Sequence, residues 1–355
     1  MVDWSDQPST VSLAIFTVAW CAGWLGFLRA KQLPQATRFE REAVSVIIPC
    51  RNEVANLPTL LRSLQSVLRE TDEVIVVDDD SRDGTAHVAK QGGATVIHID
   101  SLPSGWAGKS YACWQGVQHA SRNVVVFIDA DVRVGPRGVD DLVAKVAEHP
   151  DALVSAMPWH RTGSPVERFS MLFNVISSLV GSMQTRNARR RVAYGPFMAV
   201  RKDVYAESAG HSHDLVRAAV VEDLALARVM PESLAYLARP DQVEYRMYRE
   251  GWKQLVEGWT KNTAIGAVSV PRWSAVIIIA WVASLCGGVL TSPWMYVASV
   301  VQVWVLARRI GNFGAVSALL YPLHATVFAC VAIRSLVRSA VVGRVTWRGR
   351  TIATR

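Results

Sequence analysis

Val44-Ser-Val-Ile-Ile-Pro-Cys50 runs directly into Arg51-Asn52-Glu53, and an apolar run followed by polar residues recurs twice before residue 134. The two later examples are Glu73-Val-Ile-Val-Val77 before Asp78-Asp79, and Val124-Val-Val-Phe-Ile128 before Asp129-Ala130-Asp131. Nearly continuous runs of Val and Ile are typical of strands buried on both faces, as in a parallel sheet covered by helices. The carboxyl ends of such strands form the binding edge of the sheet. The sequence therefore predicts an α/β fold with a mostly parallel sheet and one polar site at its edge.

Four uncharged apolar blocks lie towards the two ends of the 355-residue chain, at 11–28, 274–290, 293–307 and 313–333. Each approaches the ~20 residues that a helix needs to cross ~30 Å of hydrocarbon. The first block could instead belong to a signal peptide, but Asp3 precedes it where a basic leader would be expected, and no small-x-small cleavage site follows. We therefore predict an N-terminal membrane anchor and C-terminal membrane segments.

The formal charge of +8 is concentrated beside these blocks, for example at Arg29 and Lys31 after the first and at Arg308 and Arg309 after the third. Basic residues next to membrane segments mark the cytoplasmic side and favour anionic lipid, so this charge gives no reason to expect a nucleic-acid partner. We predict a multi-pass protein of the cell membrane with its catalytic part in the cytoplasm. The predicted divisions are an anchor and linker at 1–42, a catalytic domain at 43–262, membrane segments at 263–335 and a basic cytoplasmic tail at 336–355.

The last apolar block is interrupted by Pro322 and His324. A proline in the middle of a helix removes a hydrogen-bond donor and breaks the helix. Four complete crossings would also return the arginine-rich tail to the outside. We therefore expect 313–333 to form a re-entrant or broken hairpin that enters and leaves on the cytoplasmic face, with its backbone sheltered by other helices.

Asp129 and Asp131 are the candidate metal ligands. Mg²⁺ and Mn²⁺ prefer oxygen ligands, commonly one or two carboxylates together with the phosphates of a substrate. Such a cation neutralises the charge that builds up on a diphosphate when a sugar leaves it. An isolated Asp-x-Asp is more often a solvated turn, but this one directly follows a predicted buried strand.

The ends of the other two strands supply candidate contacts to a nucleotide. A carboxylate at Asp78 or Asp79 can accept the imide N–H of uracil, and the residues that end the first strand lie at the same edge. A simpler interpretation of the second cluster is a turn and a helix cap, for which Asp83-Gly84-Thr85 is well suited, and the two interpretations are compatible. The predicted donor-binding residues are Pro49, Arg51, Asn52, Glu53, Asp78, Asp79, Lys109 and Asp129.

Lys109 lies in a glycine-flanked loop at 102–110, ahead of an expected helix at 111–120. A lysine at the start of a helix can reach a diphosphate. The loop is not a P-loop, because that motif requires a glycine five residues before Gly108, where the sequence has Pro103.

Glu222 and Asp223 belong to the start of a further expected helix at 220–228. Adjacent side chains on a helix point about 100° apart, so the two carboxyl groups would not share one proton. A base must deprotonate an acceptor hydroxyl as it attacks a sugar; Asp223 is the candidate for that role, and Glu222 the candidate for orienting the site. An acidic first turn stabilised by the helix dipole is the alternative for both residues.

These residues, in this order, resemble family-2 glycosyltransferases of the GT-A type between about Val44 and Asn262. The resemblance implies a Rossmann-like GT-A fold with helices on both faces of the sheet. It also implies an inverting, metal-dependent transfer from a nucleoside diphosphate sugar. In that reaction Asp79 would lie near the base, Asp131 would bind Mg²⁺ or Mn²⁺, and Asp223 would act as the general base.

Several further motifs are similar to those of membrane enzymes that glycosylate carotenoid acids such as diaponeurosporenoate. This likeness implies UDP-glucose as the donor and a lipid acceptor, either a carotenoid acid or another polyisoprenoid. It also places the site near the bilayer, where Trp252 and Trp259 are expected to anchor at headgroup level. The motifs are Gly105-Trp106-x-Gly108-Lys109, Gly195-Pro196-Phe197 to Arg201, Gly210-His211 before Val221-Glu222-Asp223, Glu257-Gly258-Trp259-x-Lys261-Asn262 and Trp347-Arg348-Gly349-Arg350.

Two departures from the family pattern stand out. The Gln-x-x-Arg-Trp motif of processive synthases is absent, which disfavours polymer synthesis, and Gly195-Pro196 replaces the Gly-Gln of many members. The open alternatives are transfer to polyprenyl phosphate, which needs no base, a ceramide- or sterol-type glucosyltransferase, and a catalytically inactive membrane scaffold. A scaffold would be expected to have lost acidic motifs that this chain retains, namely Asp79, Asp129, Asp131, Glu222 and Asp223.

Overall fold

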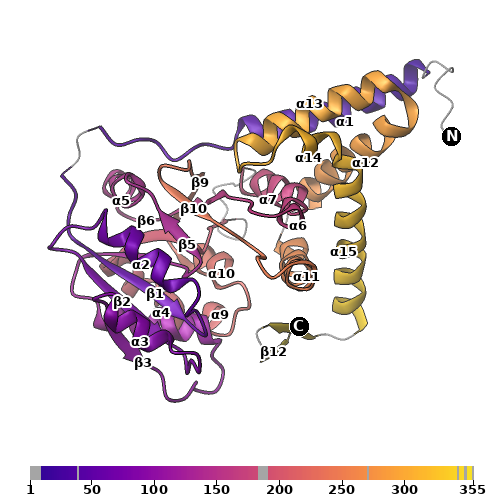
Figure 1. Ribbon diagram of the computed structural model, residues 1–355. Helices are drawn as coiled ribbons and strands as arrows, with labels where there is room; N and C mark the ends of the chain where they lie inside the picture. The colour runs from indigo at the N-terminus through magenta and orange to yellow at the C-terminus, as the bar shows by residue number, and fades with distance from the viewer. Residues whose placement is uncertain are drawn as a thin grey trace. The chain divides into compact units, whose positions relative to one another are not determined.

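The computed structural model describes residues 9–37, 40–182, 191–269, 272–341, 344–347 and 350–353 of the chain. The chain forms two compact units, each visible in Figure 1. The sheet unit comprises Gln32–Trp159 and Gln184–Arg246, and the helical unit comprises Met1–Lys31, His160–Met183 and Met247–Arg355. The predicted domain limits at residues 42, 262 and 335 stay a prediction.

The sheet unit is built on a seven-stranded sheet in the order β3-β2-β1-β4-β8-β6-β9. β1 pairs in parallel with β2 and with β4, β2 with β3, and β6 with β9, whereas β8 is antiparallel to β4 and β6. The three strands predicted from their apolar runs are therefore confirmed, and their carboxyl ends share one edge. The strands are β1 (Val44–Cys50), β2 (Glu73–Asp78), β3 (Thr95–His98), β4 (Val124–Ile128), β6 (Ala152–Met157), β8 (Phe197–Arg201) and β9 (Glu232–Leu237).

Helices cover both faces of this sheet. Val46, Ile47 and Ile48 of β1 are all fully buried, and consecutive strand residues point to opposite faces. One cover is α4, whose Cys113 shares a hydrophobic cluster with Ile47 and Phe127. The predicted mixed α/β class, with a mostly parallel sheet, is thus confirmed. The helices are α2 (Leu57–Gln65), α3 (Thr85–Gln91), α4 (Gly108–His119), α5 (Gly138–Glu148), α8 (Lys202–Glu207), η2 (Gly210–Ser212), α9 (Asp214–Arg217) and α10 (Glu222–Val229).

A second, smaller sheet contains β5 (Val132–Val134) and β10 (Val243–Tyr245), which pair antiparallel. Its third strand, β7 (Trp159–His160), has two residues. Strands of two or three residues are too short for a hydrophobic period to show, so no pattern in the sequence predicts this sheet. This sheet helps to position the candidate site, because β5 begins directly after Asp131.

The linker that leads into β1 is fixed to the sheet unit by buried charges. Arg41 Nη2 lies 2.6 Å from Asp72 Oδ2, and neither side chain is exposed. Arg41 Nε also donates to Asp140 Oδ1 at 2.5 Å. Earlier in the linker, the Leu33 N–H donates to the Leu237 carbonyl at 2.9 Å. These contacts hold the described parts of the linker against the sheet.

Among the described residues of the helical unit, two helices are long and apolar enough to cross a membrane, Thr10–Leu28 and Trp273–Thr291. Length and composition alone give weak support for membrane association, and the multi-pass topology stays a prediction. Gln302 is buried, and it accepts from Trp281 Nε1 and donates to the Trp20 carbonyl, both at 2.8 Å. The elements are α1 (Thr10–Leu28), α6 (Pro165–Arg168), α7 (Met171–Ser182), α11 (Trp252–Ser269), α12 (Arg272–Thr291), α13 (Pro293–Arg308), α14 (Ala315–Leu319), α15 (Tyr321–Val341), β11 (Arg344–Trp347) and β12 (Arg350–Ala353).

The break expected at Pro322 is present. α14 ends at Leu319 and α15 begins at Tyr321, so Pro322 lies in the first turn of α15. A proline there removes an N–H that has no partner within the helix, which is why the helix can continue to Val341. Whether this block re-enters or crosses a bilayer stays a prediction. Residues 348 and 349 of the closing motif and Arg355 lie outside the described residues.

Trp259 differs from its expected place at a membrane surface. Its side chain is 5% exposed, its ring stacks on Phe173 with centroids 4.5 Å apart, and its Nε1 donates to Ser170 Oγ at 3.1 Å. Trp259 is therefore a core residue of the helical unit, because its indole finds both a ring and a hydrogen-bond acceptor there. Trp252 remains 46% exposed, and its anchoring role stays a prediction.

Candidate functional site

The turn after β1 interlocks with the turn after β2. Asn52 adopts a left-handed conformation with φ 54°, and its backbone N–H donates to Ser81 Oγ while its side-chain oxygen accepts from the Arg82 N–H, both at 2.9 Å. The Glu53 N–H donates to Thr85 Oγ1 at 2.8 Å. Asn52 and Glu53 thus build the edge of the sheet, and their predicted contact with a donor stays a prediction.

Two buried carboxylates end β2 at this edge. Asp78 is 1% exposed, and its Oδ2 lies 3.1 Å from His98 Nδ1. Asp79 is 5% exposed, and Arg51 Nη1 donates to its carbonyl oxygen at 2.8 Å while lying 3.4 Å from its Oδ2. Half-buried Pro49 belongs to the β1 segment that delivers Arg51 to this place. The structure therefore brings Arg51 and Asp79 together, as expected of a shared site.

Lys109 connects three segments that are far apart in the sequence. α4 begins at Gly108, earlier than expected, so Lys109 lies in its first turn. Its Nζ is 2.7 Å from Asp129 Oδ1 at the end of β4 and 2.7 Å from Glu222 Oε1 at the start of α10. Burial opposes the charged form, but the two carboxylates outweigh it and hold the pKa of Lys109 well above its usual value. The lysine therefore stays protonated at the edge of the sheet.

Asp223 lies beside this cation in an environment that disfavours its charge. Burial and the neighbouring charge of Glu222 raise the pKa of Asp223 to about 6, although Lys109 and two backbone N–H groups favour the carboxylate. Those donors are the N–H of Gly195, 2.7 Å from Oδ2, and the N–H of Leu224, 2.9 Å from Oδ1. A carboxylate with a pKa of about 6 is a stronger base than an ordinary Asp and is still mostly ionised at neutral pH.

The loop before β8 joins the two halves of the site through backbone atoms. The Gly195 N–H holds Asp223, and the Pro196 carbonyl accepts from the Asp129 N–H at 3.1 Å. A Cβ at Gly195 would come within 2.9 Å of Asp223 Oδ2, which explains a residue without a side chain there. The proline at 196 removes no contact of this kind, because any residue supplies a carbonyl. Sequence reasoning did not find this use of Gly195.

Asp131 is half-buried between β4 and β5, and its charge interacts with the buried hydroxyl of Tyr245. Burial, and then the charge of Asp131, raise the pKa of Tyr245 above its usual value. In the described part of the chain, no three His, Cys, Asp or Glu side chains are grouped to hold a metal by themselves. A cation held by one or two protein carboxylates, here Asp129 and Asp131, and by donor phosphate oxygens stays a prediction.

The turn at Gly210–Ser212 packs against Tyr205 and precedes the segment that leads to Glu222. Gly210 has φ 49°, and a Cβ there would meet the Tyr205 ring at 2.2 Å. The His211 N–H donates to the Tyr205 hydroxyl, and that hydroxyl lies 2.9 Å from His211 Nδ1. Since a backbone N–H can only donate, the hydroxyl hydrogen is left to point at Nδ1. Burial and the charge of Lys109 lower the pKa of His211 to about 3, so its imidazole is neutral.

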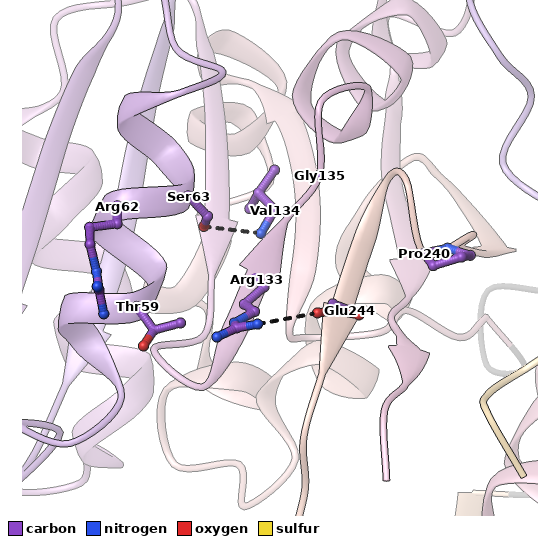
Figure 2. A pocket seen from close by; sticks show the side chains of 8 residues that line it. All are labelled: Thr59, Arg62, Ser63, Arg133, Val134, Gly135, Pro240 and Glu244. Carbon is purple, nitrogen blue, oxygen red and sulfur yellow. Dashed lines mark hydrogen bonds and ion pairs between the residues drawn. The ribbon is translucent and has the colours of Figure 1, made fainter. Parts of the chain in front are cut away.

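A separate cleft of about 380 Å³ lies between α2, β5 and β10 (Figure 2). Arg133 Nη1 is 3.7 Å from Glu244 Oε1, and the Val134 N–H donates to Ser63 Oγ at 3.2 Å. Its lining includes none of the predicted site residues, although β5 follows Asp131 directly. The lining consists of Thr59, Arg62, Ser63, Arg133, Val134, Gly135, Pro240 and Glu244.

Comparisons with known proteins bear on the family and the fold of the chain. The model of glycosyl transferase family 2 matches residues 45–208. The 4,4'-diaponeurosporenoate glycosyltransferase of Staphylococcus aureus strain USA300 is 32% identical over 368 aligned positions, which cover 96% of this chain and 97% of the relative; the protein of strain MRSA252 shows the same values. Among solved structures, the mannosyltransferase PcManGT from Pyrobaculum calidifontis, in complex with GDP-Man and Mn²⁺, has a TM-score of 0.53.

PcManGT is 18% identical, with 94% of this chain and 98% of that chain covered, so the likeness concerns the fold alone. The staphylococcal relatives match along nearly the whole length, and this identity is high enough to assign the chain to a family. Because the family model and these nearly full-length relatives agree, the chain belongs to glycosyl transferase family 2.

Proposed function

We propose that this glycosyltransferase moves a sugar, glucose from UDP-glucose, to a lipid acceptor in the membrane, with inversion at the anomeric carbon. The acceptor is a carotenoid acid or another polyisoprenoid. The observation that carries the proposal is the position of Lys109, which lies between Asp129 and Glu222 and beside Asp223 at the carboxyl edge of the sheet. A cation, a metal motif and a base candidate are what a sugar transfer from a diphosphate requires.

The donor half of the proposal uses the ends of β1, β2 and β4. Arg51 fixes Asp79, which is the candidate for the uracil contact, and Lys109 is the candidate for the diphosphate. Bound Mg²⁺ or Mn²⁺ on Asp131 and Asp129 would neutralise the charge of the leaving diphosphate. The complex of PcManGT with GDP-Man and Mn²⁺ supports a nucleotide sugar and a metal within this fold.

The acceptor half of the proposal uses Asp223. A hydroxyl nucleophile must lose its proton as it attacks, and Asp223 is held by two backbone N–H groups where it can take that proton. A carboxylate nucleophile is already ionised at neutral pH, because its ordinary pKa is about 4, and it needs no base. The contribution of Asp223 therefore distinguishes a hydroxyl acceptor from an acid.

The lipid character of the acceptor rests on the relatives and on the helical unit. The staphylococcal relatives are named for diaponeurosporenoate, an apolar acid. The described helices α1, α12 and α13 expose large apolar side chains, among them Ile15, Ile279 and Trp294. We place this surface in the bilayer, with the donor site reached from the cytoplasm.

The deciding experiment measures nucleotide release by the detergent-solubilised protein with UDP- and GDP-sugars, Mg²⁺ or Mn²⁺, and three acceptors. The acceptors are a carotenoid acid, the matching carotenoid alcohol and a polyprenyl phosphate. We expect metal-dependent UDP release with the acid or the alcohol. Release with polyprenyl phosphate alone would replace the proposal by a lipid-linked sugar synthase. No release with any donor and acceptor would contradict catalysis altogether.

The variant Asp131→Asn tests, in the same assay, whether Asp131 binds the metal. We expect loss of metal-dependent nucleotide release with normal expression, because an amide is a much poorer ligand for a hard divalent cation than a carboxylate. The matched control is Asp214→Asn, which removes a carboxylate that is 82% exposed and paired with nearby Arg217. Unchanged release by Asp131→Asn would remove Asp131 from the metal site.

A further inference from the structure

Glu222 is directed at Lys109. Its Oε1 is 2.7 Å from Lys109 Nζ. Glu222 is 6% exposed, whereas the Lys109 side chain is 34% exposed, so the ion pair is buried at the carboxylate and open to solvent at the lysine. Asp223, the next residue, is held instead by the backbone of Gly195 and Leu224. The two carboxylates of the pair therefore have different partners and can have different tasks.

The charge of Lys109 is balanced by a small number of groups in the described part of the chain. Asp129 and Glu222 contact it directly, and Asp223 adds a weaker attraction. The other titratable neighbours are neutral at physiological pH, because burial raises the pKa of the Cys113 thiol and lowers that of His211. A diphosphate that binds Lys109 must therefore share the ammonium with Glu222.

We propose that Glu222 competes with the nucleoside diphosphate for Lys109 and thereby promotes release of the nucleotide product. This inference rests on the proposed function, since it requires a nucleoside diphosphate at Lys109. When the diphosphate is bound, Lys109 is drawn towards it and Glu222 loses part of its countercharge. When the sugar has been transferred, the return of Lys109 to Glu222 favours departure of the nucleotide.

Competition of this kind has a physical use. After transfer the nucleotide carries more negative charge than the sugar-bearing donor, so a site with an unopposed lysine would hold the product more tightly than the substrate. Product release limits the turnover of many enzymes. A buried carboxylate that draws the lysine back lowers the affinity for the product, at the cost of some affinity for the donor.

The test compares the binding of UDP, UMP and uridine to wild-type protein and to Glu222→Gln, by calorimetry with Mg²⁺ present and with GDP in parallel. We expect Glu222→Gln to bind UDP about tenfold more tightly, the order expected when a unit charge is removed at close range in a partly buried site. The gain should be smaller for UMP and absent for uridine, which carries no phosphate. Asp214→Asn, the exposed control, should leave all three affinities unchanged.

Kinetics supply a second readout. With acceptor present, Glu222→Gln should be inhibited by UDP at about one tenth of the concentration that inhibits the wild type, with a lower kcat where release limits turnover. Glu222→Asp keeps the charge but draws it back from Lys109, so it should fall between the wild type and Glu222→Gln and serves if the amide variant does not fold.

The outcomes are distinct. Unchanged or weaker UDP binding by Glu222→Gln would overturn the inference, and so would an equal change for uridine, because that pattern indicates a structural role. If the wild type binds neither UDP nor GDP, the proposed function fails, and the inference fails with it. If the wild type binds UDP but Glu222→Gln does not bind it more tightly, the proposed function is retained and only the inference about Glu222 fails.

Discussion

At the scale of single residues, the environment of Asp223 makes a prediction about pH. Burial and Glu222 raise the pKa of its carboxyl to about 6. Only the ionised form can accept a proton, so transfer to a hydroxyl acceptor should fall as the pH decreases through about 6. Asp223→Asn should lower that transfer by ~10² to 10⁴ at pH 7.5 and remove this limb of the pH profile. Donor binding should be kept.

The matching carotenoid acid is the control for this prediction. Because its carboxylate needs no base, Asp223→Asn should affect transfer to the acid far less than transfer to the alcohol. Equal losses with the two acceptors would show that Asp223 acts other than as a base, and loss of donor affinity would place it in the donor pocket.

Gly195 gives a second prediction at this scale. In Gly195→Ala the new Cβ would lie 2.9 Å from Asp223 Oδ2 and 3.1 Å from its Cβ, so the carboxylate must move. We expect transfer to fall by at least tenfold while UDP affinity is kept. Gly314→Ala, where the new methyl meets nothing within 4 Å, is the matched control. Normal transfer by Gly195→Ala would show that the position of Asp223 is not critical.

Individual site residues were predictable to different degrees. Asp129, Asp131, Glu222 and Asp223 could be singled out because acidic side chains follow apolar runs or begin a helix. The pairing of Lys109 with two of them could not, because it depends on how β4, α4 and α10 are brought together by tertiary packing. For the same reason the burial of Trp259 was missed, since its partners lie in another part of the chain.

At the scale of elements, predictability followed length and burial. β1, β2 and β4 were found because both faces of each are buried, which demands continuous apolar residues. The start of α4 was placed too late, because glycine and lysine in 108–109 looked like loop residues, yet Gly108 opens the helix. The short strands β5 and β10 are held by their partners, and no local pattern marks them.

The linker contacts of Arg41 give a prediction for this scale. Its guanidinium is fully buried between Asp72 and Asp140. Arg41→Ala leaves the buried Asp72 carboxylate without its ion-pair partner and with the backbone N–H groups of Val44 and Arg69 as donors, and loss of one partner of a buried pair typically costs about 3–5 kcal/mol. The midpoint of thermal unfolding in detergent should therefore fall by several degrees. Arg201→Ala breaks an exposed pair with Asp203 and should change the midpoint little, so equal effects would contradict the role given to Arg41.

At the scale of the whole molecule, the chain combines a polar site on the sheet unit with large exposed apolar side chains on the helical unit. Basic residues beside α1 and α13 predict a cytoplasmic face for both ends of the membrane part. A tag after residue 355 should therefore be digested by protease only in opened cells or inverted vesicles. A tag accessible from outside intact cells would contradict the predicted re-entrant hairpin. A tag on an extracellular loop of a known membrane protein is the control.

The loop at Gly195 and Pro196 has a consequence for how sequences of this kind are interpreted. Its two contributions to the site are an amide hydrogen and a carbonyl oxygen, and neither belongs to a side chain. Position 195 must lack a side chain, because a Cβ would collide with Asp223, and position 196 must orient its carbonyl towards the Asp129 N–H. The proline at 196 therefore keeps the carbonyl contact with the Asp129 N–H. The motif therefore specifies a backbone conformation: position 195 requires glycine, whereas the carbonyl at 196 can come from any residue that fits this conformation.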